Sequence, residues 1–139
     1  MTNATLDFRI EPNANPVSPD VREGLLADPG FGRVFTDHMV TVRYSIEKGW
    51  HDAVVGARQP IPMDPAASVL HYAQEIFEGM KAYKLADGGT ALFRPEANAQ
   101  RFRESAVRLA MPQLPEDVFL ESVRLLVDID RAWIPAGEG

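Results

Sequence analysis

Arg101 is the residue whose type and position best suit the binding of an anion. It lies in the first two turns of a helix that the sequence predicts from Pro95, where free backbone N–H groups and the helix dipole favour negative charge. Charge-assisted hydrogen bonds from arginine to phosphate are among the stronger ones in proteins. The alternative is an ordinary exposed helix arginine, because Arg94, Arg103 and Arg108 lie nearby.

The stretch LHYAQEIFEGMKAYK, residues 70–84, opens with a helical pattern and closes with a strand pattern. Gly79 interrupts it, and a glycine inside a strand usually marks a bulge or the close approach of a ligand or another backbone segment. Tyr72 and Phe77 stand on either side of the change of pattern. Aromatic residues there are more often core than pocket wall, so the residues alone leave both interpretations open.

Residue spacing disfavours several other kinds of site. The histidines do not show the spacing of metal ligands on a helix, so no metal site is expected, and His38 is interpreted as a strand residue bonded to backbone. The nucleophile motif GxSxG does not occur, and neither do the phosphate-binding motifs GxGxxG and GxxxxGK. The lysines are Lys48, Lys81 and Lys84. The last two are interpreted as solvated charges on a strand beside a polar turn.

The length and composition of the chain exclude several classes of protein. The chain has 139 residues, a net charge of −6 and a hydrophobic fraction of 45%, which fits one folded domain of ordinary size. Negative net charge argues against binding nucleic acid. The sequence has no apolar run long enough to span a bilayer and no signal-peptide pattern, so we expect no membrane partner and a cytoplasmic location. With 0 cysteines, disulfides and thiolate chemistry are excluded.

Hydrophobic patterning predicts the elements that position these residues. Alternation over 35–46 predicts a strand that turns back through Lys48-Gly49 into a hairpin. A second hairpin is predicted from a strand over 76–85 and the turn Asp87-Gly88.

Helices are predicted at four places. A short one lies around 21–26 and ends before Pro29. Another is expected from Asp64 as N-cap to about Gln74. The clearest helix starts at Pro95, and the last one runs from Pro115 to about 133.

Strands followed by helices indicate an α+β fold, with an antiparallel sheet and two helices packed on it. We expect residues 1–30 to form an N-terminal arm and residues 31–139 an α+β domain. A doubly wound parallel sheet is disfavoured, because the predicted strands come in hairpins.

Three stretches together resemble the branched-chain amino acid aminotransferases, pyridoxal-phosphate enzymes of class IV (fold type IV). They are GFGRVFTDHMV, LHYAQEIFEGMKAYK and LFRPEANAQRFRESAVRLAMP, in this order. The resemblance covers residues 31–133. FEG alone would be a weak signal, because D-amino acid aminotransferases and aminodeoxychorismate lyases carry similar steps.

The resemblance implies a role for five residues. Tyr72 and Phe77 would line the pocket for the apolar side chain of the substrate, and Phe31 would form another wall. Gly79 would let the backbone approach the substrate. Arg101, three residues after the Asn of the FRPxxN motif, would bind the phosphate of the cofactor.

The resemblance also implies the reaction: transfer of the amino group of leucine, isoleucine or valine to 2-oxoglutarate, with pyridoxal 5′-phosphate, in a homodimer. The catalytic lysine of the family lies in a second domain, and the lysines of this chain do not match its position. We therefore expect these residues to be the N-terminal domain of such an enzyme, without a catalytic residue and inactive alone.

Two alternatives stay open. One is a non-catalytic α+β module that binds a partner through an apolar face. The other is a sibling class IV enzyme, a D-amino acid aminotransferase or an aminodeoxychorismate lyase.

Overall fold

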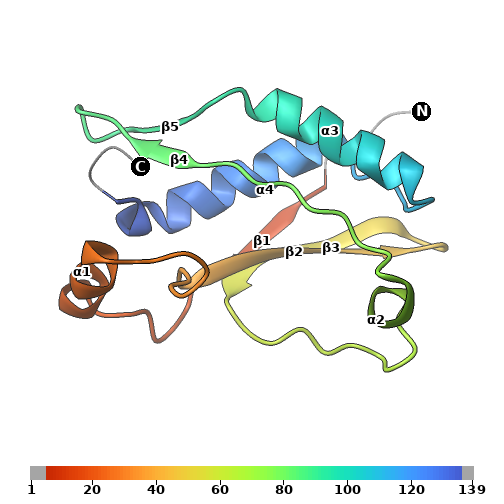
Figure 1. The fold of residues 1–139 in the computed structure, drawn as a ribbon, viewed down its shortest axis with the longest axis horizontal. Helices are drawn as coiled ribbons and strands as arrows, with labels where there is room; N and C mark the ends of the chain where they lie inside the picture. The colour runs from red at the N-terminus through yellow and green to blue at the C-terminus, as the bar shows by residue number, and fades with distance from the viewer. Residues whose placement is uncertain (1–5, 136–139) are drawn as a thin grey trace.

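The computed structural model describes residues 6–135 of the chain. The first five residues of the expected arm and the last four of the expected domain lie outside this range. Within it the fold is α+β, as predicted, with a sheet at one side, helix α4 in the middle and helix α3 beyond it (Figure 1). No helix of residues 6–135 combines the length and apolar character needed to cross a bilayer.

The main sheet has three strands: β1 (Phe8–Glu11), β2 (His38–Ser45) and β3 (Gly49–Ala57). The hairpin of β2 and β3 is confirmed, and Gly49 has the positive φ of 67° that this turn requires. The order is β1-β3-β2, and β1 runs parallel to β3. The sheet is therefore mixed, whereas an antiparallel sheet was predicted. The difference comes from β1, which lies in the segment predicted as an arm.

Two long helices cover this sheet in succession. Helix α4 (Glu116–Ile129) contacts β2 and β3, and helix α3 (Pro95–Arg108) packs on α4. The rings of Phe102 and Phe119 meet between the helices, with centroids 5.2 Å apart. Both helices were predicted, although the last one ends at Ile129 and a separate 3-10 turn (Arg131–Trp133) follows.

The second hairpin is shorter than predicted. Strands β4 (Ala82–Lys84) and β5 (Thr90–Leu92) pair antiparallel through the Asp-Gly turn. The predicted strand over 76–85 was wrong for 76–81, which form a loop between α2 and β4.

Of the two short helices, one agrees with its prediction and the other begins later than predicted. Helix α1 (Pro19–Ala27) is confirmed and ends before Pro29. Helix α2 (Ser68–Tyr72) begins later than predicted. Asp64 closes a local turn, in which its carboxylate accepts a hydrogen bond from the Ala66 N–H at 2.7 Å, and the extended backbone of Ala67 (ψ 134°) separates this turn from the helix.

Asp37, just before β2, connects the segment before α1 to the turn after α4. Its side chain is buried, and one carboxylate oxygen accepts from the Trp133 indole N–H at 2.7 Å. The other oxygen accepts from the backbone N–H of Val17 at 2.9 Å. The segment before α1 and the turn after α4 are thus held on one carboxylate.

The neighbouring residue, His38, makes a second buried connection. Its Nδ1 lies 2.6 Å from a carboxylate oxygen of Asp130, and its backbone N–H donates to the other oxygen at 3.1 Å. The backbone N–H of Asn13 donates to Nε2 at 2.9 Å. Because Nε2 accepts this bond, Nδ1 carries the proton and donates to Asp130. The expectation that His38 bonds to backbone is confirmed, and its carboxylate partner was not predicted.

Replacing Asp130 by alanine should destabilise the protein, because it leaves two buried donors of His38 without an acceptor. The expected loss is about 1–3 kcal/mol of unfolding free energy, measured by urea denaturation. Asp128→Ala is the matched control: this carboxylate is exposed and pairs with Arg124 and Arg131, so its loss should cost roughly 0–1 kcal/mol. Equal losses in the two variants would contradict the importance of the buried contact.

Candidate functional site

The loop between α2 and β4 is fixed along α3 at two points, and Figure 1 shows it running beside this helix. Near its start, the side-chain amide of Gln74 donates to the carbonyl of Leu109 at 2.9 Å, past the C-terminal end of α3. Near its end, the side-chain amide of Asn98 donates to the carbonyl of Gly79 at 3.0 Å. The loop therefore runs antiparallel to α3, and side-chain hydrogen bonds rather than strand pairing hold it in place.

The chain enters this loop through a left-handed residue. Ala73 follows α2 directly and has a φ of 48°. This conformation ends the helix and turns the chain toward α3, a place where glycine is the usual residue. Anchoring by Gln74, the next residue, fixes the loop after this turn.

Glu78 is the centre of the cluster at the end of the loop. Its carboxylate accepts two hydrogen bonds from Arg101, one from Nε and one from Nη2, the latter at 2.8 Å. The side-chain amide of Asn98 donates to the same carboxylate at 2.6 Å. The Glu78 side chain is 7% exposed, whereas that of Arg101 is 61% exposed. A covered, anchored carboxylate thus holds an arginine that faces solvent.

The electrostatics of this cluster keep both partners charged. The hydrogen bonds from Arg101 lower the pKa of Glu78 below its ordinary value, more than partial burial raises it, and the bond from Asn98 lowers it further. The same pair raises the pKa of Arg101. At neutral pH the cluster is a carboxylate and a guanidinium in fork geometry.

Arg101 has the donors that a phosphate group needs. A guanidinium has five N–H groups, and the two bonds to Glu78 use one on Nε and one on Nη2. The N–H groups of Nη1 take no part in these bonds, and the exposure of the side chain leaves it accessible. The residue present therefore fits the phosphate of pyridoxal phosphate by its chemistry.

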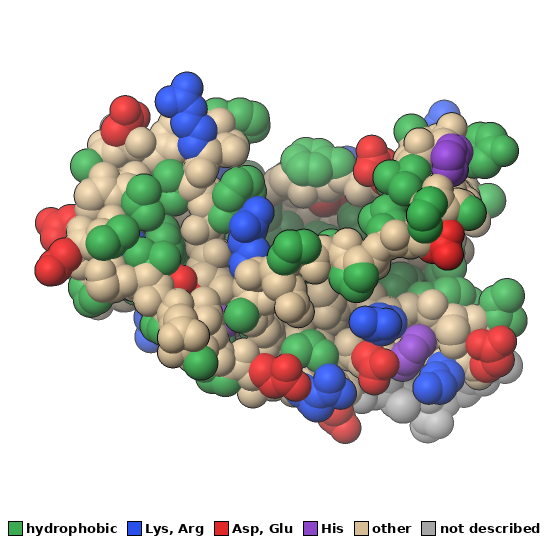
Figure 2. Space-filling view, turned by 90° about the horizontal axis from the view of Figure 1, so that it is seen from below, with side chains coloured by type: hydrophobic (Ala, Val, Ile, Leu, Met, Phe, Trp, Pro, Cys, Tyr) green, Lys and Arg blue, Asp and Glu red, His purple; other side chains and the backbone are tan. Residues whose placement is uncertain are grey.

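The aromatic residues of the expected pocket lie on the surface of this chain. Phe31 is 101% exposed, Phe77 87% and Tyr72 83%. Phe31 belongs to the segment between α1 and β2, whereas Tyr72 is the last residue of α2; Figure 1 shows α1 and α2 at opposite ends of the molecule. Hydrophobic side chains gather over both ends on the face in Figure 2. The described residues thus do not close a pocket around these aromatic rings.

Gly79 has a neighbour within the chain. A Cβ at this position would lie 3.4 Å from the ring of Phe77, a normal van der Waals contact. A side chain at position 79 would therefore touch the Phe77 ring without a severe clash.

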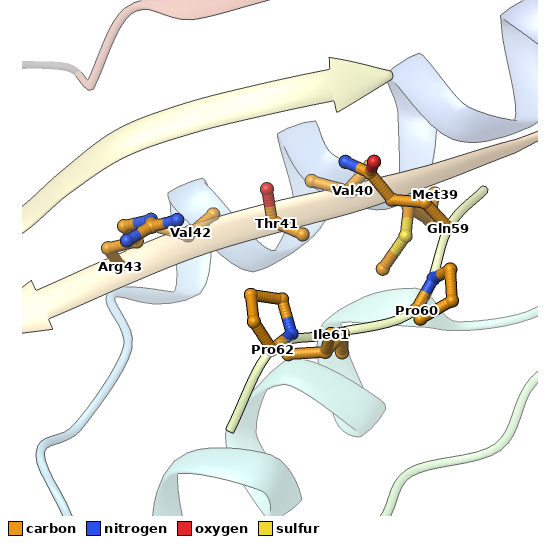
Figure 3. Close-up of a pocket in the computed structure, with 9 residues that line it drawn as sticks. All are labelled: Met39, Val40, Thr41, Val42, Arg43, Gln59, Pro60, Ile61 and Pro62. Carbon is orange, nitrogen blue, oxygen red and sulfur yellow. The ribbon is translucent and has the colours of Figure 1, made fainter. Parts of the chain in front are cut away.

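An open hollow of about 530 Å³ lies elsewhere, between the free edge of β2 and the segment Gln59 to Pro62 (Figure 3). Arg43 is the one charged side chain among the residues that line it. The expected site residues do not contribute to it. Within residues 6–135, no group of three potential metal ligands is found either.

Sequence reasoning singled out Arg101 but not the two residues that hold it. Glu78 and Asn98 lie 20 residues apart, and a spacing of this size predicts no contact by itself. Both stand in the quoted motifs, FEG and FRPxxN, so their presence in the two motifs was the available signal.

The sequence matches known proteins over its whole length. It is 53% identical over 139 residues to a branched-chain-amino-acid aminotransferase of Mycolicibacterium smegmatis. It is 51% identical over the same length to a probable one of Streptomyces coelicolor and 45% identical to branched-chain-amino-acid aminotransferase 2 of Bacillus subtilis.

The chain spans 37–38% of the length of these relatives. No family model matches the sequence. The resemblance inferred from the three motifs is confirmed.

Replacing Arg101 by glutamine should raise the pKa of Glu78 toward its ordinary value, because it removes the hydrogen bonds that lower this pKa most. Carboxyl carbon NMR during a pH titration measures the change. Arg103→Gln is the control, since Arg103 lies on the same helix but pairs with Glu116 at 2.8 Å.

The lowered pKa of Glu78 also makes the unfolding free energy depend on pH. A pKa lower in the folded than in the unfolded state contributes stability above the unfolded-state pKa, which is lost as the pH falls through the folded-state value. The wild-type protein should therefore lose this contribution in acid, and Glu78→Gln should show a smaller acid-induced loss. An unchanged acid profile in that variant would contradict the ion pair.

Proposed function

We propose that this chain is the N-terminal part of a branched-chain-amino-acid aminotransferase, and that the whole protein transfers the amino group of leucine, isoleucine or valine to 2-oxoglutarate. The anchored and exposed Arg101, at the place where the family motif has its phosphate-binding arginine, carries this proposal. The names of relatives that match all 139 residues support it.

Pyridoxal phosphate supplies the electron sink of a transamination when it is bound. The residues of this chain would bind and orient it. Arg101 would donate hydrogen bonds to the phosphate, and the loop that carries Phe77 and Gly79 is tied to the same helix by Asn98. Cofactor anchor and substrate wall would thus share one rigid support.

The exposed aromatic rings support a site that other parts of the protein complete. Phe31, Tyr72 and Phe77 are almost fully exposed here, and burying such rings is favourable. We propose that further residues of the protein, or a second subunit of a homodimer, cover them and close the substrate pocket. We also propose a cytoplasmic location and a role in the biosynthesis of branched-chain amino acids.

The experiment that tests this function uses the protein as its source cells make it. Incubation with leucine and 2-oxoglutarate should yield glutamate, and the activity should fall after removal of pyridoxal phosphate and return when it is added. Activity with D-alanine alone would favour a sibling class IV enzyme. If the protein shows no transaminase activity and is isolated with other proteins bound to it, the non-catalytic module would be favoured.

Replacing Phe77 by alanine should raise the KM for leucine more than the KM for alanine. Burial of a phenylalanine contributes about 1.5–3 kcal/mol, so loss of the wall should raise the KM for leucine on the order of tenfold. Because this ring is 87% exposed in the chain, the substitution removes few contacts within the chain itself.

Phe93→Ala is the control for this measurement, because Phe93 is also exposed, at 76%, and lies after β5. It should leave both KM values unchanged. Equal increases for leucine and alanine in Phe77→Ala would contradict the role of this ring as a wall for branched side chains.

A further inference from the structure

Glu78 and Arg101 differ in how firmly the chain holds them. The Glu78 side chain is 7% exposed and accepts from Asn98 at 2.6 Å in addition to its two bonds from Arg101. Asn98 is itself buried on α3 and also holds the carbonyl of Gly79. The Arg101 side chain is 61% exposed. In this pair the carboxylate is the fixed partner and the guanidinium is the one that is oriented.

An exposed arginine without such a partner samples many rotamers, and ordering it on binding an anion costs conformational entropy. Two parallel hydrogen bonds to one carboxylate fix the plane and the direction of the guanidinium. Glu78 uses the Nε and Nη2 side of this fork. The Nη1 side is then presented in a defined direction.

We propose that Glu78, anchored by Asn98, is a positioning residue that orients Arg101 for the phosphate of pyridoxal phosphate. This inference rests on the proposed function and adds to it a residue whose own charge opposes phosphate binding. Two effects of Glu78 therefore compete. Orientation strengthens the contact of Arg101 with phosphate, and the carboxylate charge repels the same group. The proposal states that orientation dominates.

The test compares two ligands on the apoprotein prepared from the full protein: pyridoxal phosphate and pyridoxal, which lacks the phosphate. The ratio of their dissociation constants, measured by equilibrium dialysis, isolates the phosphate contact. Damage to the fold weakens both ligands alike and leaves this ratio unchanged.

Glu78→Gln should reduce the preference for pyridoxal phosphate on the order of tenfold, the lower end of what the loss of an orienting partner costs. Glu75→Gln is the matched control: it is the same substitution on the same loop, at an exposed residue, and should leave the ratio unchanged. Arg101→Gln should remove most of the preference. In the Arg101→Gln background, Glu78→Gln should have no further effect, because Glu78 acts through Arg101.

Several results would overturn the inference. An increased preference in Glu78→Gln would show that the carboxylate charge, not orientation, dominates. An unchanged preference, with or without equal weakening of both ligands, would leave Glu78 without a role in the phosphate contact. A further loss in the double variant would mean that Glu78 acts independently of Arg101. A wild-type protein without a preference for pyridoxal phosphate would overturn the proposed function as well.

Discussion

The buried contact of His38 with Asp130 is the constraint on which the remainder of the fold depends. It joins residues 92 positions apart, at the start of β2 and the end of α4. The backbone N–H of Asn13 binds the far side of the same imidazole. Among residues 6–135, Val55 is the largest side chain with less than 2% exposure. Because the core is this small, the polar contacts help to fix where α4 lies on the sheet. Helix α3 then packs on α4 and carries the candidate site.

A second set of contacts places the loop that holds the candidate site. Residues 76–81 were predicted as a strand, yet side-chain hydrogen bonds hold this segment in place. Asn98 donates to the Gly79 carbonyl, and Gln74, just before the segment, donates to the Leu109 carbonyl. This support brings Glu78 to α3 and leaves the ring of Phe77 facing solvent. A loop tied to a helix in this way can present both an oriented arginine and an apolar wall, which a central strand buried on both faces could not.

The sequence predicted the elements whose signals are local. The alternation before Lys48-Gly49 and the Asp-Gly turn both gave hairpins, and Pro95 marked the start of α3. It missed what depends on distant partners: β1, whose four residues pair with β3, and the contacts of Glu78. Arg101 was singled out because its place in a helix and in a motif agreed, whereas no local pattern predicts its contact with the Glu78 carboxylate.

A crystal structure of the protein, as its source cells make it, with pyridoxal phosphate bound tests the central claim most directly. The account predicts a phosphate oxygen within about 3 Å of a guanidinium nitrogen of Arg101, while Glu78 keeps its bonds to Nε and Nη2. A phosphate bound away from Arg101, with that side chain in contact only with Glu78, would contradict it.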